Sequence, residues 1–500
     1  MHIRQKPHDM NPPNAAPRRK LRRTVLFPAL VLTLTLTGCA MGGGEESDSP
    51  YVYETQFLSP EGGVESFTVS GDSVYYSTFN GEFYQWTPGG EARKLDIDPF
   101  TIEVDHRLLQ ADYRLLQADH QGNLYVFYSV PNPPKSDTRY LVKYDAAGKE
   151  LARQNVSPLT SQFVPYETAA DGEGRLYLKG IDKLLLFDGT CNYVGTVEAP
   201  EGENPSWLAG DAAGHVYCSL YDTQDNGIIR EVVCGGEASG DSQGGSPQDS
   251  QTASFGNPLG EAVPGNYLAA YGENRFLNSV DNSLYLNDLT SNTLTLLLQW
   301  ANCDIDPDSV ERIATLADGR IVLRFEEEQG TGELAVVTEV PRDQATEKEV
   351  ITLGVLQAGN SHLLRCISQF NRHSPDCRIE IREYYDTYLA SGQAEAKEEA
   401  RTALHMDISS GRCPDLLVLE YDDLEAYAAK GLLEDLAPYL EEDGDLELAD
   451  NVIEAYTFHG KLCALPGALQ IRTLAGRADR LGELGGATGW TLEEMMGFID

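Results

Sequence analysis

Acidic residues are the most abundant groups in this chain that could carry out chemistry. Neighbouring carboxylates such as Asp422-Asp423 and Glu441-Glu442 could supply the acid and base of glycoside hydrolysis. With 78 Asp and Glu residues, such pairs arise by chance and are typical of solvated helix surfaces. The nine histidines lack metal-ligand spacing, and the sequence has no Gly-x-Ser-x-Gly, His-Glu-x-x-His or P-loop motif. We therefore predict no catalytic residues, metal or cofactor.

The cysteines do not form a metal-binding pattern either, because none of the nine is part of a Cys-x-x-Cys pair. Cys39 stands apart at the end of an apolar segment and leaves an even number behind. Disulfides are therefore allowed in an exported protein but not demanded. The role expected for most of these cysteines is that of small buried residues.

The first 39 residues have the pattern of an export signal. Basic residues at 18–23 precede the apolar run 25–36, which is shorter than the roughly 20 residues of a membrane-spanning helix. The run ends in Leu36-Thr37-Gly38-Cys39, which resembles the lipobox of bacterial lipoproteins. The resemblance implies that Cys39 is lipidated and anchors the protein to the extracytoplasmic face of the cell membrane. An ordinary signal peptide and an uncleaved anchor are the alternatives. Residues 40–50 would form a flexible tether.

The length and charge of the chain limit the possible architectures and partners. A chain of 500 residues is expected to contain two or three domains. The formal net charge of −40 repels nucleic acids and anionic lipid head groups, so neither is an expected partner.

Residues 51–345 have a β-rich pattern in which one phrase recurs. An Asp opens a turn, a Gly follows three residues later, and alternating apolar residues then enter a strand. The clearest copies are Asp119-His-Gln-Gly122-Asn-Leu-Tyr125, Asp171-Gly-Glu-Gly174-Arg-Leu-Tyr177 and Asp211-Ala-Ala-Gly214-His-Val-Tyr217, with looser copies at 71–75 and 318–322. A spacing of roughly 40 to 50 residues is the period of a four-stranded propeller blade. The pattern resembles β-propellers, and anchors near 75, 125, 177, 217, 276 and 322 predict about six blades. A β-sandwich is the alternative.

Two further features lie in this half. The six-residue segment 107–112 is repeated seven residues later at 114–119, as either an extra helical turn or a looped-out copy of a strand. The segment 235–265 is rich in Gly, Ser, Gln and Asp and is predicted to be a disordered loop within one blade.

Residues 346–500 have a different pattern, in which strands and helices alternate. Predicted strands at 349–356, 377–384 and 414–420 are followed by predicted helices at 361–371, 393–409 and 422–430. This alternation predicts a mainly parallel sheet covered by helices, with a ligand at the carboxyl ends of its strands.

Five phrases in this half resemble the sugar-binding family of extracellular solute-binding proteins that serve bacterial ABC importers. They are Phe370-Asn371-Arg-His-Ser-Pro375, Gly411-Arg-Cys-Pro414-Asp415, Lys430-Gly431-Leu-Leu-Glu-Asp435-Leu436, Gly460-Lys461-Leu-Cys-Ala-Leu465-Pro466 and Gly489-Trp490-Thr491-Leu-Glu-Glu494. Gly431 can end a helix in the left-handed conformation, and Thr491 with Glu494 has the spacing of a capping box. The resemblance implies the amino-terminal lobe of a periplasmic-binding-protein-like domain. Because the sequence ends at Asp500, the second lobe is expected to lie mostly beyond it.

The resemblance also places ligand contacts on the loops after the first and third strands and at the crossover between lobes. The corresponding residues are Gln357, Asn360, Glu420, Tyr421, Asp422 and Gln470. Polar groups and aromatic faces suit sugar hydroxyls and ring C–H groups. For each residue a solvated loop or helix-cap role is the alternative; Asp422, for example, could N-cap its helix. Trp490 is expected to be a packing residue.

Together these patterns predict a multidomain lipoprotein. The expected order is a signal peptide at 1–39, a tether at 40–50, a propeller at 51–345 and an incomplete solute-binding lobe at 346–500. The expected function is capture of a carbohydrate-like solute for a membrane permease, without catalysis. The alternatives are a surface glycan-active enzyme with a catalytic propeller and a solute sensor.

Overall fold

The computed structural model describes residues 50–97, 101–104, 107–110, 112–131, 137–160, 163–224, 226–234, 253–262, 267–326, 331–357, 359, 361–385, 393–443 and 448–466. These residues belong to one compact unit, which spans Gly43–Asp500. The predicted lipidation site Cys39 and the predicted contact residues Asn360 and Gln470 lie outside the described residues, as do Trp490 and Thr491.

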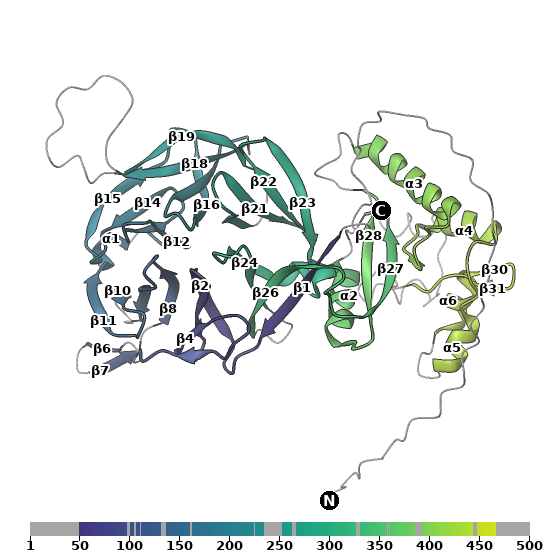
Figure 1. The fold of residues 1–500 in the computed structure, drawn as a ribbon, viewed down its shortest axis with the longest axis horizontal. Helices are drawn as coiled ribbons and strands as arrows, with labels where there is room; N and C mark the ends of the chain where they lie inside the picture. The colour runs from purple at the N-terminus through teal and green to yellow at the C-terminus, as the bar shows by residue number, and fades with distance from the viewer. Residues whose placement is uncertain are drawn as a thin grey trace, which may run out of the picture. The chain divides into compact units, whose positions relative to one another are not determined.

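The larger part of the described chain forms six four-stranded antiparallel sheets, which are the blades of a β-propeller (Figure 1). Blade one contains β2 (Val64–Ser70), β3 (Ser73–Thr78), β4 (Phe83–Trp86) and β5 (Arg93–Lys94). Blade two contains β8 (Asp112–Ala118), β9 (Leu124–Val130), β10 (Thr138–Tyr144) and β11 (Glu150–Asn155), and blade three contains β12 (Glu167–Ala170), β13 (Leu176–Lys179), β14 (Lys183–Phe187) and β15 (Tyr193–Glu198). Blade four contains β16 (Asn204–Gly210), β17 (Val216–Tyr221), β18 (Gly227–Cys234) and β19 (Ala253–Ala262), and blade five contains β20 (Tyr267–Ala270), β21 (Arg275–Val280), β22 (Ser283–Asp288) and β23 (Thr293–Gln299). Each of the six predicted anchors lies in the second strand of its blade.

The sixth blade closes the ring by combining distant segments. It contains β24 (Val310–Thr315), β25 (Ile321–Glu326) and β26 (Gly332–Pro341), and its outermost strand is β1 (Tyr51–Leu58). β1 pairs antiparallel with β26 along its whole length, from Tyr51 opposite Pro341 to Leu58 opposite Leu334. The first described strand thus ties the end of the propeller to its beginning, and the sixth blade has four strands like the other five.

The Asp of the recurrent phrase shapes the turn between the first two strands of a blade. The Oδ1 atom of Asp171 accepts hydrogen bonds from the backbone N–H groups of Glu173 and Arg175, at 3.0 and 2.9 Å. Gly174 then adopts a φ of +76°, which a residue with a side chain adopts only with strain. The Oδ2 atom of Asp171 also accepts a bond from the hydroxyl of Tyr177, at 3.1 Å. The phrase therefore encodes a turn together with the buried strand that follows it.

Hydrophobic cores fill the spaces between successive blades. One core joins Tyr75 and Phe83 of blade one to Leu116 and Tyr128 of blade two, and equivalent clusters join each following pair. The ring closes with a cluster in which Phe67 and Trp86 of blade one contact Val322 and Val336 of blade six. Since every blade packs on both neighbours, the innermost strands are held at fixed positions around the centre.

One detail of the propeller decides between two sequence-based expectations, and another contradicts a prediction. Most of the first six-residue copy lies in β7 (Arg107–Gln110), which forms a hairpin with β6 (Thr101–Val104), and the second lies largely in β8, so the repeat is a looped-out strand copy. The prediction of a loop over 235–265 is wrong for residues 253–262, which form β19. That strand pairs with β18, although the register shifts at two places. Pairing within the sheet therefore outweighs the low strand propensity of its Gly-rich sequence.

The cysteine prediction is confirmed for Cys191, Cys218 and Cys303, which are buried in the propeller. Cys366 and Cys413 are exposed instead. All eight cysteines among the described residues are free thiols.

The remaining elements form an α/β domain. The propeller carries α1 (Ser157–Thr160) and the 3₁₀ helices η3 (Trp300–Cys303) and η4 (Pro307–Ser309). After them come β27 (Glu349–Val355), α2 (Ser361–His373), β28 (Cys377–Glu383), α3 (Gln393–Ser410), β29 (Leu416–Leu417) and α4 (Tyr421–Ala429). The last described elements are α5 (Ala437–Asp443), α6 (Asp450–Ala455), β30 (Thr457–Phe458) and β31 (Lys461–Leu462). The third strand is shorter than the predicted 414–420, since Pro414 has no N–H to donate to a ladder.

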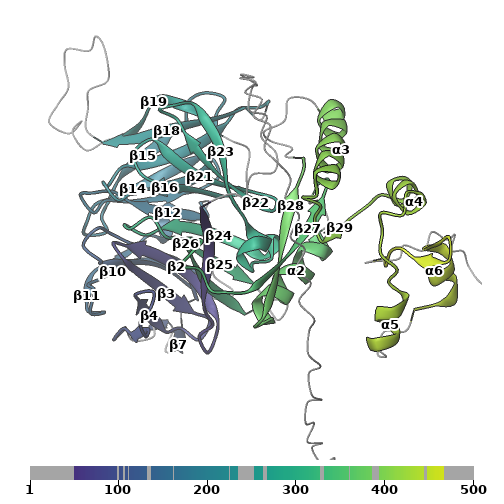
Figure 2. The ribbon, with the colours of Figure 1, turned by 45° about the vertical axis from the view of Figure 1, so that its right-hand side comes forward.

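The sheet of the α/β domain is parallel, in the order β28-β27-β29. Leu353 and Val355 of β27 pack with α2, whereas Leu356, the next residue, packs with α3. Because successive side chains of a strand point to opposite faces, the two helices cover opposite faces of the sheet (Figure 2).

Side-chain amides from both domains cover the outer edge of β28. Asn302 of η3 accepts a hydrogen bond from the N–H of Ile381 at 2.7 Å and donates to its carbonyl at 3.1 Å. Asn371 of α2 makes the same pair of bonds with Ile379, at 2.7 and 2.8 Å. An edge strand whose N–H and C=O groups are bonded in this way cannot add a further strand there.

Charged pairs strengthen the same contact between propeller and α/β domain. Arg365 and Arg372 of α2 pair with Asp306 and Glu333 of the propeller, at 2.9 and 2.5 Å. The guanidinium of Arg372 also lies 4.2 Å from the ring centre of Phe57.

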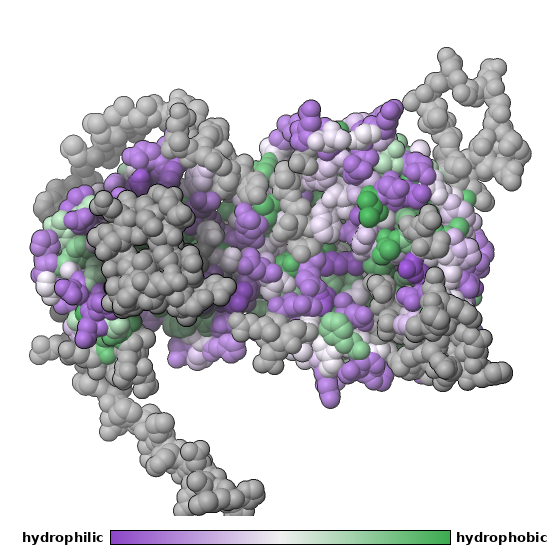
Figure 3. All heavy atoms as spheres, turned by 180° about the vertical axis from the view of Figure 1, so that it is seen from behind, coloured by the Kyte–Doolittle hydropathy of each residue, from purple (hydrophilic) through white to green (hydrophobic). Residues whose placement is uncertain are grey.

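Hydrophilic residues predominate on the face shown in Figure 3, and hydrophobic residues form small separate patches there. Within the described residues, none of the helices has the length and hydrophobicity needed to cross a membrane.

Candidate functional site

The carboxyl ends of β27 and β29 lie side by side. Leu353 pairs with Leu416 and Gly354 with Leu417 in parallel register, and the N–H of Val418 donates to the carbonyl of Gly354 at 2.9 Å. From β27 the chain passes through α2 to β28 on one side, and from β28 it passes through α3 to β29 on the other side of β27. The crevice beyond the carboxyl ends of β27 and β29 is therefore a topological switch point, where open α/β sheets bind ligands.

Four of the six predicted contact residues follow the carboxyl ends of these two strands. Gln357 follows the end of β27 by two residues, and Glu420, Tyr421 and Asp422 follow the end of β29. All four side chains are exposed. The other two, Asn360 and Gln470, cannot be placed because they lie outside the described residues.

Glu420 is held by two cations of α3. Lys397 Nζ and an Arg401 guanidinium nitrogen donate to its two carboxylate oxygens, at 2.7 and 2.9 Å. The bond from Lys397 is the main reason that the pKa of Glu420 lies below its ordinary value, and the charge of Arg401 adds to the effect. An exposed ion pair of this kind adds little stability, so its main consequence is to fix the direction of the carboxylate. The sequence contained a signal for this contact: Lys397 and Arg401 are one helical turn apart and thus share a face of α3.

Tyr421 is the aromatic surface at this edge. It is the first residue of α4, its side chain is 56% exposed, and its ring centre lies 6.2 Å from that of Phe458 in β30. A tyrosine ring that is open on one face and supported by a neighbour can pack against the C–H face of a sugar.

The alternative helix-cap role of Asp422 is wrong. The N-cap of α4 is Glu420, which makes no side-chain cap bond, and Asp422 lies inside the first turn. There its negative charge interacts favourably with the helix dipole. Asp423, its neighbour, forms an ion pair with Arg401 at 3.4 Å.

Three hydrogen bonds between Asp415 and Thr352 hold β29 against β27. The carboxylate of Asp415 accepts from the N–H and hydroxyl of Thr352, at 2.9 and 2.8 Å, and the N–H of Asp415 donates to the Thr352 hydroxyl oxygen at 3.0 Å. The bond from the Thr352 N–H is the largest cause of the lowered pKa of Asp415. Since β29 has only two residues, this clasp helps to hold the loop that carries Glu420 and Tyr421.

Two of the family phrases meet in space. The N–H of Leu436 donates to the carbonyl of Leu462 at 2.8 Å, and Asp435 Oδ1 accepts from the N–H of Leu462 at 3.1 Å. Gly431 ends α4 with a φ of +66°, as the sequence predicted, and Leu432 donates back to the carbonyl of Tyr427 at 3.1 Å. These residues, like Asp415 and Asn371, make hydrogen bonds that hold the fold together.

A family model described as bacterial extracellular solute-binding protein matches residues 387–500. The match covers α3 and the described elements that follow it, and therefore includes Glu420, Tyr421 and Asp422. It supports an extracytoplasmic location and a small-molecule solute.

Solved structures resemble this chain only at low identity. An aldose sugar dehydrogenase from Streptomyces coelicolor matches 58% of this chain and 99% of its own, with 10% identity and a TM-score of 0.35. The aldose sugar dehydrogenase of Escherichia coli matches 58% and 100%, with 13% identity and a TM-score of 0.36. A streptogramin B lyase matches 58% and 98%, with 9% identity and a TM-score of 0.31. Comparison with the curated proteins gives no match. The described chain thus combines a six-bladed propeller with an α/β domain whose sequence is similar to extracellular solute-binding proteins.

Proposed function

We propose that this protein is a lipid-anchored extracellular solute-binding protein that captures a carbohydrate for an ABC-type importer. The observation that carries the proposal is that Gln357 follows the carboxyl end of β27, while Glu420, Tyr421 and Asp422 follow that of the adjacent strand β29. The match of residues 387–500 to the solute-binding family supports it. Asn360 and Gln470 complete the proposed contact set.

The chemistry of this edge favours a neutral polyhydroxylated solute. The carboxylate of Glu420 is already paired with Lys397 and Arg401, and can still accept hydrogen bonds from hydroxyl groups. Gln357 offers both a donor and an acceptor, and Tyr421 offers an aromatic face. Binding is reversible and requires no bond to be made or broken.

The enzymatic alternative would need paired carboxylates at the centre of the propeller. Three carboxylates line the central cavity among the described residues: Asp119, Glu167 and Asp211. Those of Asp119 and Asp211 are engaged in turn bonds and in contacts with Lys143 and His215. This leaves Glu167 as the remaining described carboxylate, which favours binding over hydrolysis.

The importer and the membrane anchor belong to the same proposal. Lipid on Cys39 would keep the captured solute close to a permease, since two or more acyl chains give stable anchoring. Replacing Cys39 by Ser should abolish labelling with radioactive palmitate and release the protein from washed membranes; unchanged labelling would refute the anchor.

Solute binding is tested by thermal stability in the presence of a panel of oligosaccharides. A binding glycan stabilises the folded full chain by RT ln(1 + [L]/Kd), so the melting temperature rises with the logarithm of the glycan concentration when that concentration exceeds Kd. Tyr421→Ala should weaken the binding of that glycan about two- to tenfold, as expected for the loss of an aromatic contact. Tyr439→Ala is the matched control, because Tyr439 is also exposed (60%) but lies on α5. Equal effects of the two variants would contradict the proposed site.

A further inference from the structure

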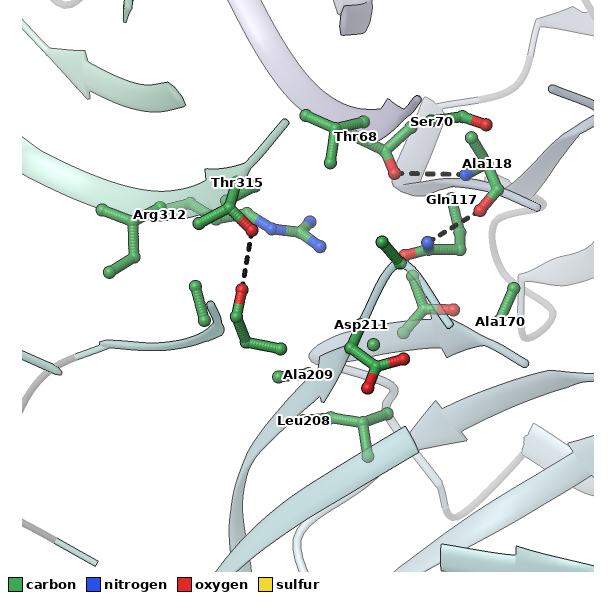
Figure 4. A pocket seen from close by; sticks show the side chains of 18 of the residues that line it. Thr68, Ser70, Gln117, Ala118, Ala170, Leu208, Ala209, Asp211, Arg312 and Thr315 are labelled. Atoms are coloured by element: carbon green, nitrogen blue, oxygen red, sulfur yellow. Dashed lines mark hydrogen bonds between the residues drawn. The ribbon is translucent and has the colours of Figure 1, made fainter. Parts of the chain in front are cut away.

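The centre of the propeller contains a cavity that the proposed function does not use. The innermost strands of all six blades line it, and its volume is about 280 Å³ (Figure 4). At about 30 Å³ for each water molecule, it has room for about nine waters. A cavity of this volume can admit a small organic molecule.

Most polar groups of the cavity wall are already bonded to neighbouring strands. The hydroxyl of Thr315 donates to the carbonyl of Ala270 at 2.6 Å, and that of Ser70 donates to the carbonyl of Asp119 at 2.8 Å. The hydroxyl oxygen of Thr68 accepts from the N–H of Ala118 at 3.1 Å. These bonds join adjacent blades and leave few donors for a ligand.

Two side chains of the wall are exceptions among the described residues: the hydroxyl of Thr168, which has no hydrogen-bond partner, and Arg312. Arg312 is the third residue of β24, and its guanidinium is directed into the cavity (Figure 4). Within the described part of the chain it makes no hydrogen bond; its interactions are with the ring of Phe67, 5.8 Å away, and with the charge of Glu167. Burial lowers the pKa of Arg312, and the charge of Glu167 opposes this shift. A guanidinium whose N–H donors have no acceptor within the described residues favours an anionic partner, because it can form charge-assisted hydrogen bonds with it.

Glu167 does not fill this role, because its carboxylate faces other groups. Its Oε2 atom accepts from the N–H of Leu208 at 2.8 Å and lies 4.0 Å from Lys179 Nζ. No carboxylate is bonded to Arg312 within the described residues, and one added carboxylate would supply both the charge and the two acceptor oxygens that its guanidinium lacks.

Trp207 gives the cavity a ring that can pack against an apolar group. We propose that the propeller channel is a second ligand site, in which Arg312 binds a small organic molecule through a single carboxylate. This site is independent of the proposed solute site in the α/β domain and would let the propeller recognise a second compound.

The test measures binding of acetate, lactate and benzoate to the full chain by ligand-observed NMR and calorimetry. The corresponding amides and inorganic phosphate are measured in parallel. At least one carboxylate should bind more tightly than both its amide and phosphate. Arg312→Gln should weaken this binding at least tenfold, and Arg312→Lys should weaken it less, because lysine keeps the charge but lacks the planar fork.

Arg320→Gln is the matched control, since Arg320 lies at the next turn of the same blade and pairs with Asp318 outside the cavity. It should leave the Kd within twofold. Circular dichroism and melting temperature identify any variant that fails to fold. If Arg312→Gln fails to fold, the effect of Arg312→Lys on carboxylate binding decides the test. The proposal is overturned if none of the three carboxylates binds at millimolar concentration, if phosphate binds more tightly, or if Arg312→Gln and Arg320→Gln have equal effects. Because Tyr421→Ala leaves the cavity intact, carboxylate binding that persists in that variant separates this site from the proposed solute site.

Discussion

Replacing Glu167 by Gln should make the protein less sensitive to alkaline pH. Burial is the main cause that raises the pKa of Glu167 to about 7 from 4.5, and it outweighs the opposing charges of Lys179 and Arg312 and the N–H of Leu208. The thiol of Cys218 is the other titratable group that interacts with it. The folded protein therefore keeps a proton on Glu167 that the unfolded chain releases.

The magnitude follows from this shift. Each pKa unit corresponds to about 1.4 kcal/mol, so the shift from 4.5 to about 7 is worth up to about 3 kcal/mol. This contribution is fully present below pH 4.5 and is lost as the pH rises through 7. About 2.5 kcal/mol of it disappears between pH 5 and pH 8.5. Since 18% of the side chain is exposed to channel water, these are upper values.

The assay is guanidinium unfolding at pH 5 and pH 8.5, followed by tryptophan fluorescence and circular dichroism. Between these pH values the parent protein should lose up to about 2.5 kcal/mol more stability than Glu167→Gln. Glu82→Gln is the control. The bond from Lys94 lowers the pKa of Glu82, so its contribution is gained near its unfolded value of 4.5 and is essentially the same at both pH values. Parallel losses in the parent and Glu167→Gln would refute the argument that burial keeps Glu167 protonated.

Three further predictions concern the fold and the edge of the sheet. Asp171→Ala should destabilise the propeller by about 2–3 kcal/mol, since the buried hydroxyl of Tyr177 and two N–H groups of the turn lose an acceptor, whereas Asp222→Ala at an exposed turn should destabilise it less; chemical denaturation measures both. Asn302→Ala should increase hydrogen exchange at the N–H of Ile381, because that group then loses its acceptor, and unchanged exchange would contradict the edge-covering role. Thr352→Val should weaken glycan binding without unfolding the domain, because it removes the hydroxyl of the clasp with Asp415; a Kd equal to that of the parent would show that the clasp does not position the loop.

The local features of the fold were predictable because they are encoded in short segments. The phrase around Asp171 and Tyr177 specifies a turn and a strand without help from the rest of the chain, so its repetition predicted the blades. The strands and helices from Glu349 to Ala429 followed their hydrophobic patterns. Gly431 was identified correctly as a helix end because glycine, which has no side chain, adopts the left-handed conformation without strain.

Features that depend on distant segments were not predictable. The pairing of β1 with β26 requires residues at both ends of the propeller to meet, and no local pattern encodes it. Arg312 and Glu167 belong to different blades and face one cavity only after the ring has closed. Asn302 gave no sign of its role, because its partner is the backbone of Ile381. The loop predicted over 235–265 is wrong for residues 253–262, because these residues pair with β18 despite a composition typical of loops.

The central claim, solute capture at the edge of the α/β sheet, is tested most directly by hydrogen–deuterium exchange. The full chain is compared with and without the oligosaccharide that raises its melting temperature most. The account predicts protection at residues 355–357 and 418–424, with unchanged exchange in the innermost propeller strands. Protection confined to the propeller, or none at the edge of the α/β sheet, would contradict it.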